Sequence, residues 1–179
     1  MPRNVEIKAR LDGEGALADV AARAAALGAD GPHLIEQDDT FFRCANGRLK
    51  LRAFAGGDGE LIYYRRPDAA GPKESFYVLA PVVDCGPPRE ALTLAYGQAG
   101  RVRKRRELWL IDRTRVHLDR VEGLGAFLEL EVVLAEDEPV SAGQEEARRL
   151  MSALGVAPAQ LVEGAYVDLL AAGPGRPAT

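Results

Sequence analysis

The chain has 179 residues, of which 47% are hydrophobic and 28% charged, and its formal net charge is −4. This length and balance are typical of one globular domain with a sizeable core, and the negative charge argues against a dedicated nucleic-acid-binding protein. No apolar run approaches the length of a membrane helix, no signal peptide is evident, and Cys44 and Cys85 lack metal-ligand spacing. We therefore expect a cytoplasmic protein that binds neither nucleic acid nor a membrane.

The first predicted element is a β-strand over residues 3–11, because polar and apolar side chains alternate strictly along it. Asn4, Glu6 and Lys8 fall on the polar face of this strand. The apolar face needs a hydrophobic core. The polar face places a carboxylate and an ammonium group in one row, which raises the question of what that row faces.

The following elements are predicted from periodicity and from the Gly and Pro residues that separate the periodic segments. In chain order they are a helix over 13–28, strands over 34–44, 48–55, 60–66 and 73–82, a helix over 87–97, strands over 101–111, 113–121 and 126–134, and helices over 141–155 and 158–172. Eight strands joined mostly by short turns predict an α+β fold with a barrel-like antiparallel sheet. We expect one domain over residues 1–172 and a disordered tail over 173–179.

The alternation of charged and apolar residues returns in four later strands. The charged residues that share a face are Arg48, Lys50 and Arg52, then Lys104 and Arg106, then Arg115, His117 and Asp119, and last Glu129 and Glu131. One such strand is usually the solvated face of a half-buried sheet. If the sheet instead closes with these faces inward, carboxylates meet bases. Burying these charges without water or a charged ligand around them would cost too much free energy.

A polyphosphate with a divalent metal requires both signs of charge at once. Carboxylates are hard oxygen ligands for Mg²⁺ or Mn²⁺, and Lys and Arg bind phosphate oxygens. A nucleic-acid interpretation of residues 101–106 leaves the carboxylates without a role, and a glycosidase interpretation leaves the bases without one. The sequence has no Gly-x-x-x-x-Gly-Lys-Ser/Thr motif, so a P-loop does not hold the phosphates.

Lysine is rare in this chain. Only four of the 23 basic residues are lysines, namely Lys8, Lys50, Lys73 and Lys104. Almost every other basic position is an arginine, so one interpretation is that these four positions need a compact ammonium group. Chance explains so small a set equally well.

Six segments carry most of these residues: NVEIKARL, GRLKLR, LIYYRRPD…GPKESFY, VRKRREL, HLDRVEGLGAFLELEVV and EGAYVDLL. In this order they resemble the motifs of the CYTH proteins, the triphosphate tunnel metalloenzymes. The resemblance implies an antiparallel eight-stranded barrel that forms a tunnel, with flanking helices. It also implies a metal-dependent enzyme, with Mg²⁺ or Mn²⁺, that acts on inorganic triphosphate, ATP or thiamine triphosphate.

The resemblance implies roles for individual residues. The metal-side carboxylates are expected to be Glu6, Asp119, Glu129 and Glu131. The phosphate-binding bases are expected to be Lys8, Lys50, Arg52, Arg66, Lys73, Lys104 and Arg106, which include all four lysines. The residues expected to act in catalysis are Glu6, Lys8, Glu129 and Glu131. Arg65 is the alternative to Arg66, because alternation alone does not decide which of the two faces the tunnel.

Asn4 stands where the signature has its first Glu, and it offers a carbonyl oxygen without a charge. A non-catalytic sensor of polyphosphate or nucleotide is therefore the alternative to an enzyme. Two enzyme chemistries also stay open. Water attack on the terminal phosphorus gives a triphosphatase, and attack of a ribose 3′-hydroxyl on the α-phosphorus of ATP gives an adenylyl cyclase of class IV, which the sequence resembles most. A homodimer stays open as an assembly.

Other side chains have a structural interpretation as the first choice. His117 shares a face with Asp119 and could contact phosphate, but a hydrogen-bonded structural role is favoured. The aromatic residues expected to pack in the core rather than stack on a base are Tyr63, Tyr64, Tyr77 and Trp109. The acids expected to be exposed are Glu36, Asp38 and Asp39.

Overall fold

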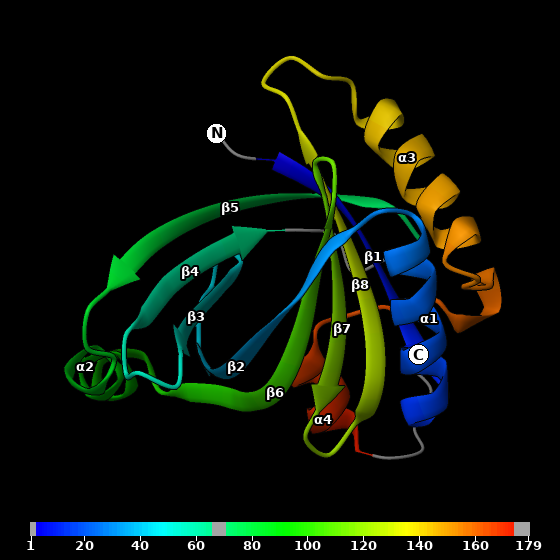
Figure 1. Cartoon of the computed structure of the whole chain (residues 1–179). Helices are drawn as coiled ribbons and strands as arrows, with labels where there is room; N and C mark the ends of the chain where they lie inside the picture. Colours follow the sequence, from blue (N-terminus) through cyan, green and yellow to red (C-terminus); the bar gives the residue numbers. More distant parts are fainter. Residues whose placement is uncertain (1–2, 66–70, 174–179) are drawn as a thin grey trace.

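Eight antiparallel strands build the sheet of the computed structural model, which describes residues 3–65 and 71–173 (Figure 1). They are β1 (Arg3–Leu11), β2 (Asp30–Phe42), β3 (Arg48–Ala53), β4 (Gly59–Arg65), β5 (Lys73–Val82), β6 (Gln98–Ile111), β7 (Thr114–Val121) and β8 (Gly125–Leu134). The order around the sheet is β1-β5-β4-β3-β2-β6-β7-β8, and β1 also pairs with β8, so the sheet closes into a barrel. The predicted fold class is confirmed.

Four α-helices flank the barrel in the described part of the chain. They are α1 (Gly13–Ala26), α2 (Gly86–Tyr96), α3 (Val140–Ala153) and α4 (Tyr166–Ala172), with a short 3₁₀ turn, η1 (Pro158–Gln160), before the last. Among the described residues, no helix combines the length and the apolar character that crossing a membrane requires. Residues 174–179 of the predicted tail lie outside the described part.

The last helix is shorter than the sequence predicts. The pattern over 158–172 suggests one helix, but Leu161 instead forms an isolated bridge with Ala9 of β1. The Val162 amide donates to the Lys8 carbonyl, so this segment is held extended against β1. The helix begins only after it, at Tyr166. This pairing across the tertiary structure prevails over the local helical preference.

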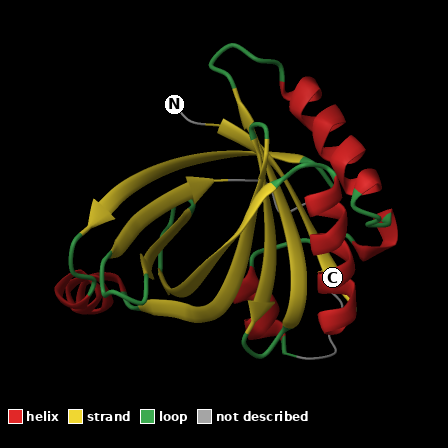
Figure 2. Cartoon of the chain, in the orientation of Figure 1, coloured by secondary structure: helices red, strands yellow, loops and turns green. Residues whose placement is uncertain are grey.

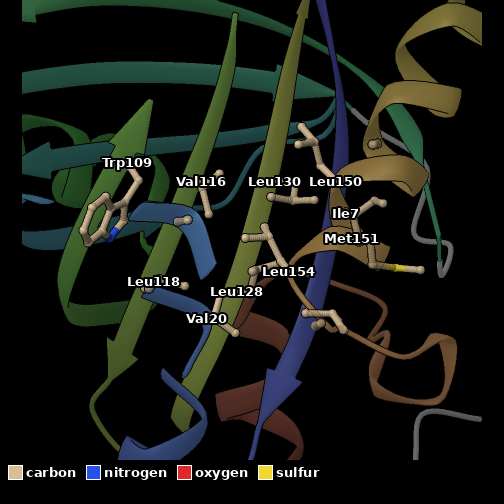
Figure 3. Packing of buried hydrophobic residues seen from close by; sticks show 14 of the residues in the cluster. Ile7, Val20, Trp109, Val116, Leu118, Leu128, Leu130, Leu150, Met151 and Leu154 are labelled. Atoms are coloured by element: carbon tan, nitrogen blue, oxygen red, sulfur yellow. The ribbon is translucent and has the colours of Figure 1, made fainter. Parts of the chain in front are cut away.

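The main hydrophobic core lies outside the barrel, between its wall and two helices. Helices α1 and α3 pack on β1, β7 and β8, on the right of Figure 1. The α1 residues Leu17, Val20 and Ala24 are three and four positions apart, which places them on one buried face. Ile7 and its apolar neighbours on β1 meet the helices from the other side (Figure 3). The apolar face of the first strand thus turns outward under the helices.

The remaining helices lie away from this core. Figure 2 shows α2 on the opposite side of the barrel from α1 and α3, and α4 near one end of the strands. Buried residues of α4 form a second cluster with Val102 of β6 and Phe127 of β8. Helix α4 is therefore fixed to the barrel wall where it can supply a side chain to the interior.

Candidate functional site

The inward faces of the eight strands enclose a cavity of about 360 Å³. Every second residue of a strand points to the same side, so alternation in the sequence becomes a continuous lining. Most of the lining side chains fall into three arcs, although Lys8 of β1 and Arg115 of β7 lie among the acids and Asp39 of β2 lies between the bases. The basic arc contains Lys50 and Arg52 of β3 and Lys104 and Arg106 of β6. The acidic arc contains His117 of β7, Glu129 and Glu131 of β8, and Glu6 of β1. The aromatic arc contains Tyr64 of β4 and Tyr77 of β5, together with the aliphatic residues Ile62 of β4 and Leu79 of β5.

Asp39 of β2 organises the basic arc. Its Oδ2 accepts a hydrogen bond from Lys50 Nζ at 2.7 Å, and its two oxygens accept from Arg52 Nε and Nη2 at 2.8 and 2.9 Å. The expectation that Asp39 is an exposed acid is wrong, since only 1% of its surface is accessible. Strand β2 continues through this residue, and Asp39 shares the inward register with Gln37 and Phe41. Glu36, on the other face, is exposed as expected.

Burial and charge act against each other on these groups. Burial raises the pKa of Asp39, but Arg52 and Lys50 more than offset it and hold that pKa well below its usual value. For Lys50 the balance is different. Burial lowers its pKa and the positive charge of Arg52 adds to the effect, so the pKa falls to about 7 despite the attraction of Asp39. The basic arc therefore holds one lysine that titrates near neutrality.

Glu129 is the centre of the acidic arc. Its Oε1 lies 3.2 Å from Lys8 Nζ and its Oε2 accepts a hydrogen bond from Arg106 Nη2 at 2.8 Å. Burial raises the pKa of Glu129, but Lys8 and the other nearby cations hold it well below its usual value. This carboxylate is therefore ionised, and it joins the acidic arc to the basic one.

Asp119 of β7 is fully buried, behind the residues that line the cavity. Its two oxygens accept hydrogen bonds from Arg106 Nε and Nη2, each at 2.6 Å, and its Oδ2 also accepts from the Tyr166 hydroxyl at 2.9 Å. Burial opposes its ionisation, but Arg106 and Lys104 outweigh burial and lower the pKa of Asp119 to about 2. The bidentate contact fixes the plane of the Arg106 guanidinium beneath the acidic arc.

Tyr166, the first residue of α4, lines the cavity and contacts Asp119 behind it. Lys8 Nζ lies 4.1 Å from the centre of its ring, and the ring of Phe127 packs against it edge-on at 5.0 Å. The Lys8 ammonium group also donates to the Gly164 carbonyl at 2.9 Å. Reasoning from the sequence assigns Tyr166 no separate role, and only the family motif EGAYVDLL includes it.

The other predicted residues fall in different places. Glu6 lines the cavity opposite Glu131 of β8, and Lys73 is buried on β5 opposite Glu6. Arg66 lies outside the described residues. Its alternative, Arg65, is exposed.

The aromatic residues divide between the two sides of the wall. Tyr64 and Tyr77 are cross-strand neighbours on β4 and β5, and both line the cavity. Trp109 faces outward and packs in the main core, as predicted. Tyr63 also faces away from the cavity, and its hydroxyl donates to the Asn46 carbonyl.

Three lining residues suit a divalent metal. His117, Glu129 and Glu131 each offer one ligand atom, and these atoms lie within 4.8 Å of one another. His117 Nδ1 and Asn4 Oδ1 are buried and have no hydrogen-bond partner among the described residues. Carboxylate and imidazole donors bind divalent metals, so the residues present fit a metal ion. The sequence predicts the inward face for His117, which the structure shows, and favours a hydrogen-bonded structural role. In the structure, its Nδ1 has no hydrogen-bond partner among the described residues.

Comparisons with known proteins agree with this architecture. The family model of the CYTH domain matches residues 2–166. No curated protein matches the chain. The PH1012 protein from Pyrococcus horikoshii OT3 has a similar structure, with a TM-score of 0.81 and 23% identity over 93% of this chain and 98% of its own.

Two further structures share the fold at lower identity. A candidate adenylate cyclase from Vibrio parahaemolyticus has a TM-score of 0.68 and 16% identity over 94% of this chain and 97% of its own. HpAC1 from Hippeastrum, for which a dominant triphosphatase activity is described, has a TM-score of 0.62 and 16% identity over 86% of this chain and 88% of its own.

Proposed function

The chain belongs to the CYTH domain family, and from this premise we propose that it is a metal-dependent enzyme that acts on a triphosphate inside the barrel. One observation carries the proposal: a closed barrel surrounds a cavity whose wall has a basic arc and, next to it at β6 and β7, an acidic arc. Buried charges of this kind are costly unless they are paired or bind a charged ligand. A triphosphate with a divalent cation carries both signs of charge and complements both arcs.

The basic arc is proposed to bind the phosphate oxygens. Lys50, Arg52, Lys104 and Arg106 are held at fixed positions, the first two by Asp39 and the last two by Asp119. Lys8 and Lys73 are proposed to add to this set, as is Arg66. A phosphate group placed among these donors would replace part of the contacts that Asp39 and Glu129 now make.

The acidic arc is proposed to hold Mg²⁺ or Mn²⁺ through Glu6, Glu129 and Glu131. A bound divalent ion would neutralise charge on the phosphate oxygens as a phosphoryl bond breaks. Asp119 resembles a metal-side carboxylate in sequence, but its oxygens are engaged by Arg106 and Tyr166. We therefore propose that Asp119 positions Arg106.

Two reactions suit this apparatus, and neither needs a side chain as nucleophile. In a triphosphatase, water attacks the terminal phosphorus. In a class IV adenylyl cyclase, the ribose 3′-hydroxyl of ATP attacks the α-phosphorus and pyrophosphate leaves. The aromatic arc provides ring faces beside the basic arc, on which the organic part of ATP or thiamine triphosphate could stack.

A non-catalytic sensor is the second candidate, and Asn4 favours it. Its amide is 3% exposed and lines the cavity, where a carboxylate in its place would add one negative charge to the metal side. A cavity with fewer carboxylates binds a metal less strongly, yet it retains all the bases that are proposed to bind phosphate.

Product analysis separates these candidates. The protein is incubated with inorganic triphosphate, ATP or thiamine triphosphate, each with Mg²⁺ or Mn²⁺. Release of orthophosphate supports the triphosphatase, and cyclic AMP with pyrophosphate supports the cyclase. Tight binding without turnover supports the sensor.

Two variants test the cavity itself. Lys50→Ala and Glu129→Ala are each expected to lower kcat/KM by on the order of 100-fold, because each removes a charge that faces the reacting phosphates. Arg105→Ala is the matched control, since Arg105 is next to Arg106 on β6 but points outward with 76% of its side chain exposed. If the two cavity variants bind and turn over substrate like the control, the proposed site is wrong.

A further inference from the structure

We infer that His117 is a metal ligand, and that Glu129, Glu131 and the imidazole of His117 together select a transition-metal dication such as Mn²⁺ over Mg²⁺. This inference rests on the proposed metal-dependent function and goes further, because it names a nitrogen ligand and a preference among metals. It is carried by the geometry of three side chains on two adjacent strands.

The pairing of β7 with β8 brings the three side chains together. His117 is directly opposite Glu129, and Arg115, one inward position away, is opposite Glu131. All of them line the same cavity. His117 itself is 4% exposed, so its ring is fixed by the barrel wall and does not move freely in solvent.

The distances suit a shared ion better than direct contact. His117 Nδ1 lies 3.7 Å from Glu131 Oε1 and 3.9 Å from Glu129 Oε2, which is too long for a hydrogen bond. Two atoms that each bind one ion at about 2.1 Å lie about 3 to 4 Å apart, depending on the angle between them. The buried Nδ1 has no hydrogen-bond partner among the described residues, and a bound ion would satisfy it.

Basic residues hold the two carboxylates from their other sides. Lys8 contacts Glu129 Oε1 and Arg106 donates to its Oε2, while Arg115 Nη1 lies 3.5 Å from Glu131 Oε2. An ionised carboxylate oxygen has two lone pairs, so the bond from Arg106 leaves one for an ion. Such outer contacts orient metal ligands and contribute to affinity.

The donor set determines which metal is preferred. Carboxylate oxygens accept Mg²⁺ and Mn²⁺ alike, but an imidazole nitrogen favours transition metals over Mg²⁺. Replacing an oxygen or a water ligand by His117 should therefore increase the ratio of Mn²⁺ to Mg²⁺ affinity. The preference then depends on one side chain, which makes it testable by substitution.

The test measures Mn²⁺ binding directly. Pulsed EPR of the Mn²⁺-loaded protein is expected to show coupling to an imidazole ¹⁴N, and titration calorimetry gives the affinities for Mn²⁺ and Mg²⁺. In His117→Gln the ¹⁴N coupling should be lost and the Mn²⁺ affinity should fall roughly tenfold or more, with a smaller change for Mg²⁺. His33→Gln is the matched control, because His33 is the other histidine of the chain, is exposed and contacts Asp30.

The outcomes distinguish this inference from the function on which it rests. Absence of ¹⁴N coupling in the Mn²⁺-loaded wild type overturns the role of His117, and this measurement does not depend on the folding of a variant. If Glu129→Gln abolishes Mn²⁺ binding while His117→Gln leaves it unchanged, the carboxylate site stands and the imidazole ligand is wrong. If neither substitution changes Mn²⁺ binding, the proposed metal site itself is wrong.

Discussion

Lys50 illustrates how the barrel changes the chemistry of a single side chain. In water its ammonium group is charged at any physiological pH, whereas inside the barrel burial and the charge of Arg52 lower its pKa to about 7. A bound phosphate would add a negative charge beside the amine and raise this pKa again. Ligand binding and protonation of Lys50 should therefore be linked.

We predict that triphosphate binding takes up a proton at Lys50. Between the lower pKa of the free protein, about 7, and the higher pKa of the complex, binding should take up close to one proton, so affinity should decrease as the pH rises above 7. Titration calorimetry in buffers with different ionisation enthalpies measures the number of protons taken up.

The control is Lys50→Arg, which keeps the charge but does not titrate in this range. It should bind triphosphate with no Lys50-linked proton uptake and a flatter pH dependence. Equal proton uptake by the variant and the wild type would assign the linkage to another group.

At the scale of elements, helix α3 packs tightly on the barrel wall at a glycine. A Cβ atom added at Gly143 would lie 2.6 Å from Leu134 Cδ2 and 2.8 Å from Val5 Cγ2, both of which belong to buried core residues. Gly15 of α1 is also within a helix, but a Cβ atom there would have no neighbour within 4 Å. A substitution at Gly143 therefore changes the packing of α3 on the wall, whereas a substitution at Gly15 changes only the helix propensity of α1.

Alanine at these two positions is predicted to have opposite effects. Gly143→Ala should lower the free energy of unfolding by about 1–3 kcal/mol, because it overpacks the contact between α3 and the wall. Gly15→Ala should raise that free energy by roughly 0.5–1 kcal/mol, because alanine loses less backbone entropy in a helix. Urea denaturation of the two variants checks this, and shifts in the same direction would contradict the proposed packing.

On the scale of the whole molecule, the barrel encloses charge that its own side chains neutralise only in part. The buried cations Lys104 and Lys50 both have lowered pKa values, chiefly because burial disfavours their charged forms. A fold that buries such groups gives up stability in exchange for a binding site. A ligand that neutralises them should restore part of that stability.

Triphosphate with Mn²⁺ is predicted to raise the melting temperature. At a ligand concentration of about 100 times Kd the stabilisation is about 2.7 kcal/mol, which corresponds to a shift of roughly 5–10 °C for a chain of this length. Orthophosphate at the same concentration should have a much smaller effect, since it contacts fewer of the bases. Thermal denaturation followed by circular dichroism measures both shifts.

Lys104→Met tests whether the shift arises in the cavity. The variant should be at least as stable as the wild type without ligand, yet its shift with triphosphate should be much smaller. Arg105→Met, on the outward face of the same strand, should retain the full shift. A full shift in Lys104→Met would place the ligand elsewhere.

The sequence by itself determined the strands and most of the helices of this protein. Alternation identified the strands and the face of each on which Glu6, Lys50, Lys104 and Glu129 lie, because side chains in a strand point to opposite sides in turn. The apolar residues between them required helices outside the wall, and α1 and α3 supply that cover. A polar face that recurs with charges of both signs was sufficient to suggest a closed, ligand-binding interior.

Only the tertiary structure decided which of these faces meet. Alternation does not tell which strands are neighbours. His117 lies opposite Glu129 only because β7 pairs with β8 in one particular register. The same holds for Asp39, which the sequence predicts to be an exposed acid, whereas the pairing of β2 with β3 places it against Lys50 and Arg52. Hydrogen bonding between strands that are distant in the chain sets these contacts. A single sequence constrains the faces of each strand, but closure of the barrel selects the site.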